Sequence, residues 1–123
     1  MTKSLSRRQR DFTLMVVRLI DWIFSNGMEA TLGEAWRTPY QQAKYFLDGK
    51  SKTLHSKHLQ RLAIDLNLFI DNHYITDPEK YRPLGEYWES INSENVWGGR
   101  FGIKKEDYAT KVGFDANHFE LQS

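Results

Sequence analysis

The residues best suited to chemistry lie between Ser56 and Asp65, where His58 and Asp65 stand seven positions apart. Imidazole and carboxylate groups both bind zinc. Apolar residues occupy every second position from Leu62 to Leu68, which predicts a half-buried strand with Asp65 on its polar side. His58 precedes this strand in a loop, so both side chains can meet at one metal ion if the loop curls back. The chain contains no cysteine, which excludes disulfides, cysteine zinc sites and thiol catalysis.

A third ligand is expected from the segment Asp115–Glu120, in which His118 follows one carboxylate by three residues and precedes another by two. Three protein ligands leave the fourth position of a tetrahedral zinc ion open for water, as in catalytic sites. Zinc lowers the pKa of that water to roughly 7, so a nearby carboxylate can take its proton and pass it to a leaving amine. Asp115 is the best placed candidate for this base. Glu120 would share a strand face with His118, so geometry alone leaves it as an alternative.

Three motifs of the chain occur together: Ser-x-His-x6-Asp, a downstream Trp-Gly-Gly and an acid-x-x-His-Phe-Glu segment. Over roughly residues 29 to 121 the chain resembles the zinc peptidases of bacterial cell walls. That family includes D-Ala-D-Ala carboxypeptidases and phage L-alanyl-D-glutamate endopeptidases. The resemblance implies that His58, Asp65 and His118 bind Zn²⁺ and that Asp115, rather than Glu120, is the catalytic base.

The resemblance also implies roles for residues around the metal. Arg37 and Gln42 lie in an Arg-Thr-x3-Gln segment, and the arginine of this segment stabilises the substrate oxygen in the family. Without the resemblance, Arg37 could instead form a surface ion pair. Ser56 matches a serine that contacts substrate or orients a ligand, although it could also cap the loop. Gln42 and Trp97 are further candidates for substrate binding, and Trp97 could instead anchor the core.

Three positions depart from the family pattern. Arg61 stands where glycine is common, Arg100 follows Trp-Gly-Gly where an acidic residue or asparagine is common, and Asn117 stands where proline is common. These positions bear on substrate contacts and on the path of the loop between the first two ligands. The types and the order of the ligands are intact.

The chain has two further histidines. His55 lies three positions before His58, so the two could share a helix face and form their own metal pair. We prefer His58 because only it keeps the seven-residue spacing to Asp65. His73 lies in a predicted turn, and we expect it to be exposed and free of metal.

The composition fits one globular domain over residues 1–123, which the resemblance implies is a peptidase domain. Hydrophobic residues make up 40% of the chain, which is enough for a single core. Seventeen basic and sixteen acidic residues give a formal charge of +1, so no global electrostatic drive toward nucleic acid exists. Arg18 and Asp21 interrupt the apolar run from Phe12 to Phe24, which argues against a secretory signal and against stable membrane insertion.

The expected fold class is α+β, with a small antiparallel sheet, helices packed on one side and a zinc cleft on the other, similar to D-Ala-D-Ala carboxypeptidases. In chain order we expect a helix over about 6–26, an extended segment over 28–37, a helix over 39–47, a strand from 62, a hairpin around 71–73, a helix over 78–92 and a strand over 117–122. The last strand would place His118 beside the strand that carries Asp65.

The resemblance implies a phage endolysin that hydrolyses the amide bond between L-alanine and D-glutamate in peptidoglycan stem peptides, with zinc-activated water as nucleophile. We expect a monomer that is made in the cytoplasm of the infected bacterial host and acts on the cell wall after release. Two alternatives stay open: a D,D-carboxypeptidase that releases terminal D-alanine, and a wall-binding module without catalysis. Asp115, retained near the expected ligands, favours an enzyme.

Overall fold

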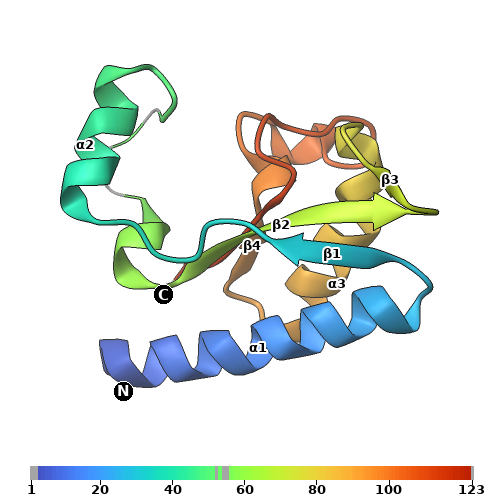
Figure 1. Cartoon of the computed structure of the whole chain (residues 1–123), viewed down its shortest axis with the longest axis horizontal. Coiled ribbons are helices and arrows are strands. Elements are labelled where there is room, and N and C mark those ends of the chain that lie inside the picture. The colour runs from blue at the N-terminus through green and yellow to red at the C-terminus, as the bar shows by residue number, and fades with distance from the viewer. Residues whose placement is uncertain (1–2, 52, 54–55, 123) are drawn as a thin grey trace.

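The computed structural model describes residues 3–51, 53 and 56–122, and Figure 1 shows their arrangement. The helices of this described part are α1 (Leu5–Ser25), α2 (Pro39–Leu47) and α3 (Arg82–Ile91). Its strands are β1 (Glu29–Leu32), β2 (Ala63–Ile70), β3 (His73–Tyr74), β4 (Asn95–Trp97) and β5 (His118–Leu121). Short 3-10 turns cover Lys57–Gln60, Pro78–Tyr81, Gly98–Arg100 and Lys105–Asp107. The expected α+β class is confirmed.

Every strand pair of the sheet is antiparallel, in the order β1-β2-β5-β4, with β3 folded back onto the end of β2. The β2–β3 turn contains Asp71 and Asn72 with φ angles of 51° and 66°, as two-residue hairpin turns of this kind require. Pairing of β2 with β5 sets Asp65 directly opposite His118. The predicted hairpin and the predicted place of the last strand are therefore confirmed.

The hydrophobic core lies between one face of the sheet and helices α1 and α3. Four alternating side chains are buried here: Leu62 directly precedes β2, and Ile64, Leu66 and Leu68 lie within it. Phe12 of α1 and Trp88 of α3 meet edge to face in this core, with ring centroids 5.7 Å apart. Since neighbouring side chains of a strand point to opposite faces, the intervening Asp65 is directed away from the core.

Helix α1 is amphipathic and supplies much of the core. Ser4 caps its start by accepting a hydrogen bond from the backbone N–H of Arg7. Its buried face consists of Phe12, Met15, Val16, Leu19 and Ile23. None of the helices in the described ranges combines the length and hydropathy that crossing a bilayer needs.

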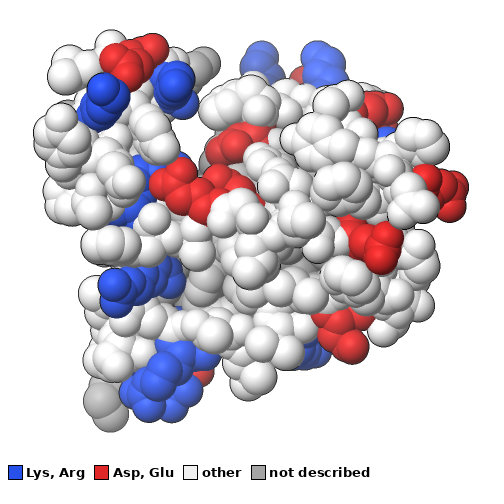
Figure 2. Space-filling model, in the orientation of Figure 1, with Lys and Arg blue, Asp and Glu red and all other residues white. Residues whose placement is uncertain are grey.

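Helix α2 stands apart from the sheet in Figure 1, and the space-filling view in Figure 2 shows a hollow between them. It begins and ends at the predicted residues. Thr38 and Gln41 form a reciprocal capping box at its start, with Pro39 at the first helical position, and Gly49 follows its end with a φ angle of 75°. The predicted helix over 78–92 is instead divided into a 3-10 turn and α3. Pro83 lacks the N–H that would continue the first turn, so the α-helix starts at Arg82.

Candidate active site

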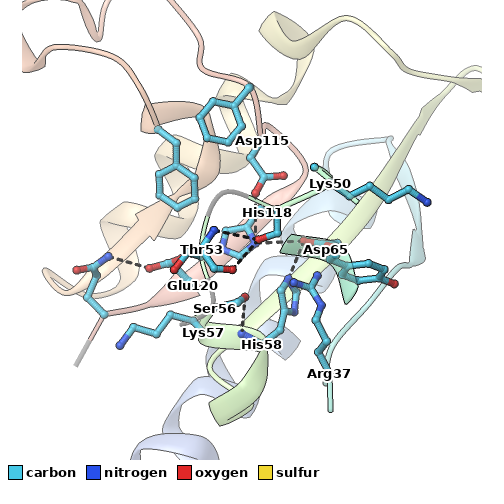
Figure 3. Close-up of a pocket in the computed structure, with 16 residues that line it drawn as sticks. Arg37, Lys50, Thr53, Ser56, Lys57, His58, Asp65, Asp115, His118 and Glu120 are labelled. Carbon is cyan, nitrogen blue, oxygen red and sulfur yellow. Dashed lines mark hydrogen bonds and ion pairs between the residues drawn. The ribbon is translucent and has the colours of Figure 1, made fainter. Parts of the chain in front are cut away.

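The side chains of His58, Asp65 and His118 converge on one point, as Figure 3 shows. They come from the 3-10 turn Lys57–Gln60, from β2 and from β5. Each offers one ligand atom, and these three atoms all lie within 4.8 Å of one another. The structure therefore brings together the three side chains that the sequence singled out as metal ligands.

The ring nitrogens of both histidines are arranged as metal ligation requires. Nε2 of His58 and Nδ1 of His118 face the same oxygen of Asp65, Oδ1, at 3.3 and 3.2 Å. The other nitrogen of each ring faces an outer acceptor. The Ala35 carbonyl lies 3.4 Å from Nδ1 of His58, and Glu120 Oε1 lies 2.7 Å from Nε2 of His118. Each neutral ring can hold its proton on the outer nitrogen and present a lone pair at the centre, so the donor set fits Zn²⁺.

Local backbone structure fixes these side chains in place. Because Asp65 pairs with His118 across two strands, their side chains emerge on the same face of the sheet. Ser56 Oγ accepts a hydrogen bond from the backbone N–H of His58 at 3.2 Å and so caps the 3-10 turn. Arg61 ends that turn with a φ angle of 59°, a conformation that glycine adopts most readily. The loop between the first two ligand positions thus keeps a glycine-type turn although arginine stands there.

The carboxylates and imidazoles of the site shift one another's pKa values. Burial disfavours the charged form of Asp65, but hydrogen bonds from His118 and His58 outweigh it and lower the pKa of Asp65 to about 2. Burial likewise opposes charge on His118, yet its contacts with Asp65 and Glu120 prevail and raise the pKa of His118 to about 9. Because histidine binds a metal ion only through a deprotonated ring nitrogen, metal binding by His118 is coupled to proton release.

Asp115 lies beside the three converging side chains and is partly open to solvent. Its Oδ2 atom lies 3.7 Å from Nδ1 of His118. Burial raises the pKa of Asp115, and the charge of His118 acts against that rise. The loop that carries Asp115 packs directly on Gly98, where an added Cβ would lie 2.0 Å from the Asp115 carbonyl oxygen. Glycine in the Trp-Gly-Gly motif thus lets this loop approach the site.

Arg37 lines the cleft, and its guanidinium group is held from several sides. It forms an ion pair with Glu34 and donates a hydrogen bond of 2.6 Å to Gln42 Oε1, while it stacks over the Tyr45 ring at 4.7 Å. Gln42 is only 1% exposed and lies behind Arg37, and its amide also donates to Ser51 Oγ at 2.9 Å. Gln42 is therefore almost completely enclosed behind Arg37 and contacts its guanidinium group, whereas its expected part in substrate binding stays a prediction.

Trp97 also lies away from the cleft. Its side chain is fully buried, and its Nε1 donates a hydrogen bond of 2.6 Å to the Ala116 carbonyl. Its ring packs on Gly85, where an added Cβ would lie 2.1 Å from the indole. The guanidinium carbon of Arg100 lies 5.2 Å from the centroid of the Trp97 ring, and Arg100 pairs with Glu89. Of the two roles considered for Trp97, the structure supports the core anchor, because a fully buried ring cannot touch substrate.

A cleft of about 670 Å³ surrounds the converging side chains and corresponds to the hollow between α2 and the sheet. Lys50 and Lys57 join Arg37 as cations in its lining, and Phe101 and Phe114 supply apolar surface. Such a mixture of cations, carboxylates and aromatic rings suits a short polar peptide.

The remaining histidines differ in what the structure says of them. His73 lies on β3 and is exposed, as expected. The competing ligand His55 lies outside the described residues.

Sequence reasoning placed Glu120 on the same strand face as His118, and the structure confirms this, but the close contact between the two side chains was not predicted. Strand alternation gives the face of a residue, whereas the distance depends on the rotamers of both side chains.

Comparison with known proteins gave one family match and several individual matches. A family model described as D-alanyl-D-alanine carboxypeptidase matches residues 49–121. The L-alanyl-D-glutamate peptidase of Listeria phage A118 is 44% identical over 48 residues. That match covers 39% of this chain and only 17% of the phage protein's length.

Solved structures resemble the fold over nearly the whole chain. The L-Ala D-Glu endopeptidase ChiX of Serratia marcescens has a TM-score of 0.69 at 19% identity, covering 98% of this chain and 88% of that one. The vancomycin resistance D,D-pentapeptidase VanY, determined in complex with Zn(II), has a TM-score of 0.59 at 20% identity, covering 92% and 71%. VanYB in complex with D-alanine-D-alanine has a TM-score of 0.58 at 18% identity, covering 92% and 70%.

Proposed function

Because this chain belongs to the D-alanyl-D-alanine carboxypeptidase family, we propose that it is a zinc-dependent peptidase that hydrolyses stem peptides of peptidoglycan. One observation carries this proposal: His58, Asp65 and His118 present three ligand atoms within 4.8 Å of one another. The outer nitrogens of both rings face acceptors, and Asp115 stands next to the centre. This arrangement matches a zinc site with three protein ligands and one open position.

The scissile bond in this proposal is the amide between L-alanine and D-glutamate. The phage relative, which is 44% identical to this chain over 48 residues, is an L-alanyl-D-glutamate peptidase. ChiX, whose structure is similar, is an L-Ala D-Glu endopeptidase. A second candidate is removal of terminal D-alanine, which the family description and the similarity to VanY favour. Both reactions need the same catalytic groups and differ in how the peptide is placed in the cleft.

The proposed catalytic roles follow from the positions of the side chains. Zinc, when bound by His58, Asp65 and His118, would make a water molecule more acidic and polarise the substrate carbonyl. Asp115 takes a proton from the attacking water and gives it to the nitrogen of the leaving amine. Its raised pKa suits both steps, because the carboxyl group must accept and then release the proton.

Arg37 and Ser56 complete the proposed site. Arg37 donates hydrogen bonds to the substrate oxygen on which negative charge develops, and its anchors keep the guanidinium pre-oriented for this. Ser56 lines the cleft and caps the turn of His58, so it orients that ligand and is also within reach of substrate. In this proposal Gln42 holds Arg37 in place through its hydrogen bond, and Trp97 holds the loop of Asp115 through its hydrogen bond to the Ala116 carbonyl.

The biological setting that we propose is lysis of a bacterial cell by a phage. The phage origin of the curated relative supports an endolysin that is made in the host cytoplasm and reaches the wall after release. The proposed partner is the peptidoglycan stem peptide, and a monomer suffices because one chain supplies every group named above.

Analysis of products from purified peptidoglycan tests the proposal and separates its alternatives. New N-terminal D-glutamate is the expected product, whereas free D-alanine would instead establish the D,D-carboxypeptidase. Binding to the wall without any product would indicate a non-catalytic module. The Asp115→Asn variant serves as the control, since hydrolysis by a contaminating enzyme would persist in it.

A further inference from the structure

We propose that Glu120 is a positioning residue that holds the His118 ring in the orientation and tautomer required for metal binding. The inference rests on the proposed zinc site formed by His58, Asp65 and His118. The buried carboxylate of Glu120 is neither one of the proposed zinc ligands nor part of the proposed proton transfer.

Strand β5 places Glu120 next to His118. Side chains alternate along this strand, so Phe119 and Leu121 enter the core while His118 and Glu120 share the cleft face. Glu120 is only 6% exposed. Because carboxylates are rarely buried without a partner, a partner for Glu120 is expected nearby. Its Oε1 atom lies 2.7 Å from Nε2 of His118, closer than the 3.2 Å between Nδ1 and Asp65.

The Glu120 carboxylate is itself held in place. Its second oxygen, Oε2, accepts a hydrogen bond of 2.7 Å from the side-chain amide of Gln122. Its backbone carbonyl accepts a hydrogen bond of 3.0 Å from the indole of Trp88. Figure 3 shows Glu120 and Asp65 on opposite sides of the His118 ring. Glu120 therefore approaches the ring from the side away from Asp65, where it is no part of the converging group.

This contact selects one tautomer of His118. A neutral imidazole carries a single proton, and a carboxylate at Nε2 favours the proton there, which leaves the lone pair of Nδ1 for the metal. An anionic acceptor also increases the basicity of the ring, as carboxylates behind zinc-bound histidines do. The acceptor behind His58 is the neutral Ala35 carbonyl at 3.4 Å, so Glu120 provides the stronger of these two outer contacts.

Zinc affinity of Glu120 variants is the test. Metal-stripped protein is titrated with zinc against a chelating indicator for the wild type, Glu120→Ala and Glu120→Gln. The dissociation constant should rise about 10- to 100-fold in Glu120→Ala. Glu120→Gln should lose less, because its amide oxygen can still accept the proton of Nε2 but carries no charge.

A matched control separates positioning from general destabilisation. Glu89 is another partly buried carboxylate, and it pairs with Arg100 outside the cleft. Glu89→Gln should lower the unfolding temperature and keep the dissociation constant for zinc within about threefold of the wild type, the scatter expected without a change at the metal. In Glu120→Ala, the rise in unfolding temperature upon zinc addition should shrink, because weaker binding contributes less stabilisation.

Three results would overturn the proposal. Unchanged zinc affinity in both Glu120 variants would make the contact incidental. Complete loss of zinc from Glu120→Gln would make Glu120 a ligand, and full zinc affinity with abolished hydrolysis would make it the base instead of Asp115. If the wild type itself bound no zinc, the proposed function would fail, and that outcome is distinct from all three.

Discussion

The two sides of the cleft are held by different forces. On the sheet side, strand pairing sets Asp65 opposite His118, and the reverse face of the same strands is packed against α1 and α3. On the α2 side, Gln42 is the buried residue of the helix, and Arg37 is oriented by ion pairing and hydrogen bonds with Glu34 and Gln42. Backbone pairing and apolar packing fix one side, whereas polar side-chain contacts fix the other.

This difference corresponds to the proposed division of labour. A metal site tolerates little displacement of its ligands, and a paired, packed sheet supplies fixed positions. In the proposed function, contacts with substrate on the α2 side would be made by Arg37, which is held by polar partners. Substitutions on the sheet side should therefore affect metal content and stability, while those on the α2 side should affect turnover with the metal retained.

The largest effect is expected from His118→Ala on the sheet side. Loss of one ligand should remove zinc and reduce peptidoglycan hydrolysis by about a thousandfold or more, because several kcal/mol of metal stabilisation disappear. Elemental analysis and a turbidity assay measure both quantities. His73→Ala changes an exposed histidine of β3 and should retain zinc and activity. Full zinc content in His118→Ala would contradict the ligand assignment.

Asp115→Asn should separate chemistry from metal binding. Removal of the general base should lower the rate by about 10²- to 10⁴-fold. Zinc content should stay at about one ion per chain, since three protein ligands suffice. The same two assays apply, and loss of zinc would show that Asp115 is a ligand.

Gly85→Ala should test the packing of α3 against the Trp97 ring. The added Cβ would lie 2.1 Å from the Trp97 indole, so the core must shift, at a cost of about 1–3 kcal/mol in the free energy of unfolding. Denaturant unfolding measures this change. Glu86→Ala, at an exposed position of the same helix, should stay within about 0.5 kcal/mol of the wild type. Equal stability of the two variants would refute the tight packing.

The smallest effect is expected from Gln42→Ala on the α2 side. Arg37 loses one of its anchors, which should reduce kcat/KM by about tenfold, the equivalent of roughly 1.4 kcal/mol for a charged hydrogen bond. Zinc content should not change. Tyr40→Ala alters an exposed neighbour on the same helix and should leave turnover intact. Loss of zinc from Gln42→Ala would mean that the two sides of the cleft are not independent.

Local sequence signals predicted much of the fold. Thr38 and Pro39 placed the start of α2 and Gly49 placed its end, because capping depends on residues that are adjacent in sequence. Alternating apolar residues located β2 and put Asp65 on the open face. The expected neighbour of that strand was also correct, since β5 sets His118 opposite Asp65.

What the sequence left open depends on contacts between distant residues. The full burial of Trp97 follows from its packing on Gly85, and its indole is fixed by the Ala116 carbonyl. Gln42 has a polar side chain typical of a surface, and only the tertiary structure encloses it behind Arg37. The role of such residues cannot be predicted from type and spacing, because burial is a property of the assembled fold.

The central claim is that His58, Asp65 and His118 hold a zinc ion on which hydrolysis depends. The most direct test is elemental analysis of purified protein, together with clearing of purified peptidoglycan before chelation, after chelation and after return of zinc. We expect about one zinc ion per chain and clearing that the chelator abolishes and zinc restores. Protein that binds no metal and clears peptidoglycan equally well in chelator would contradict the account.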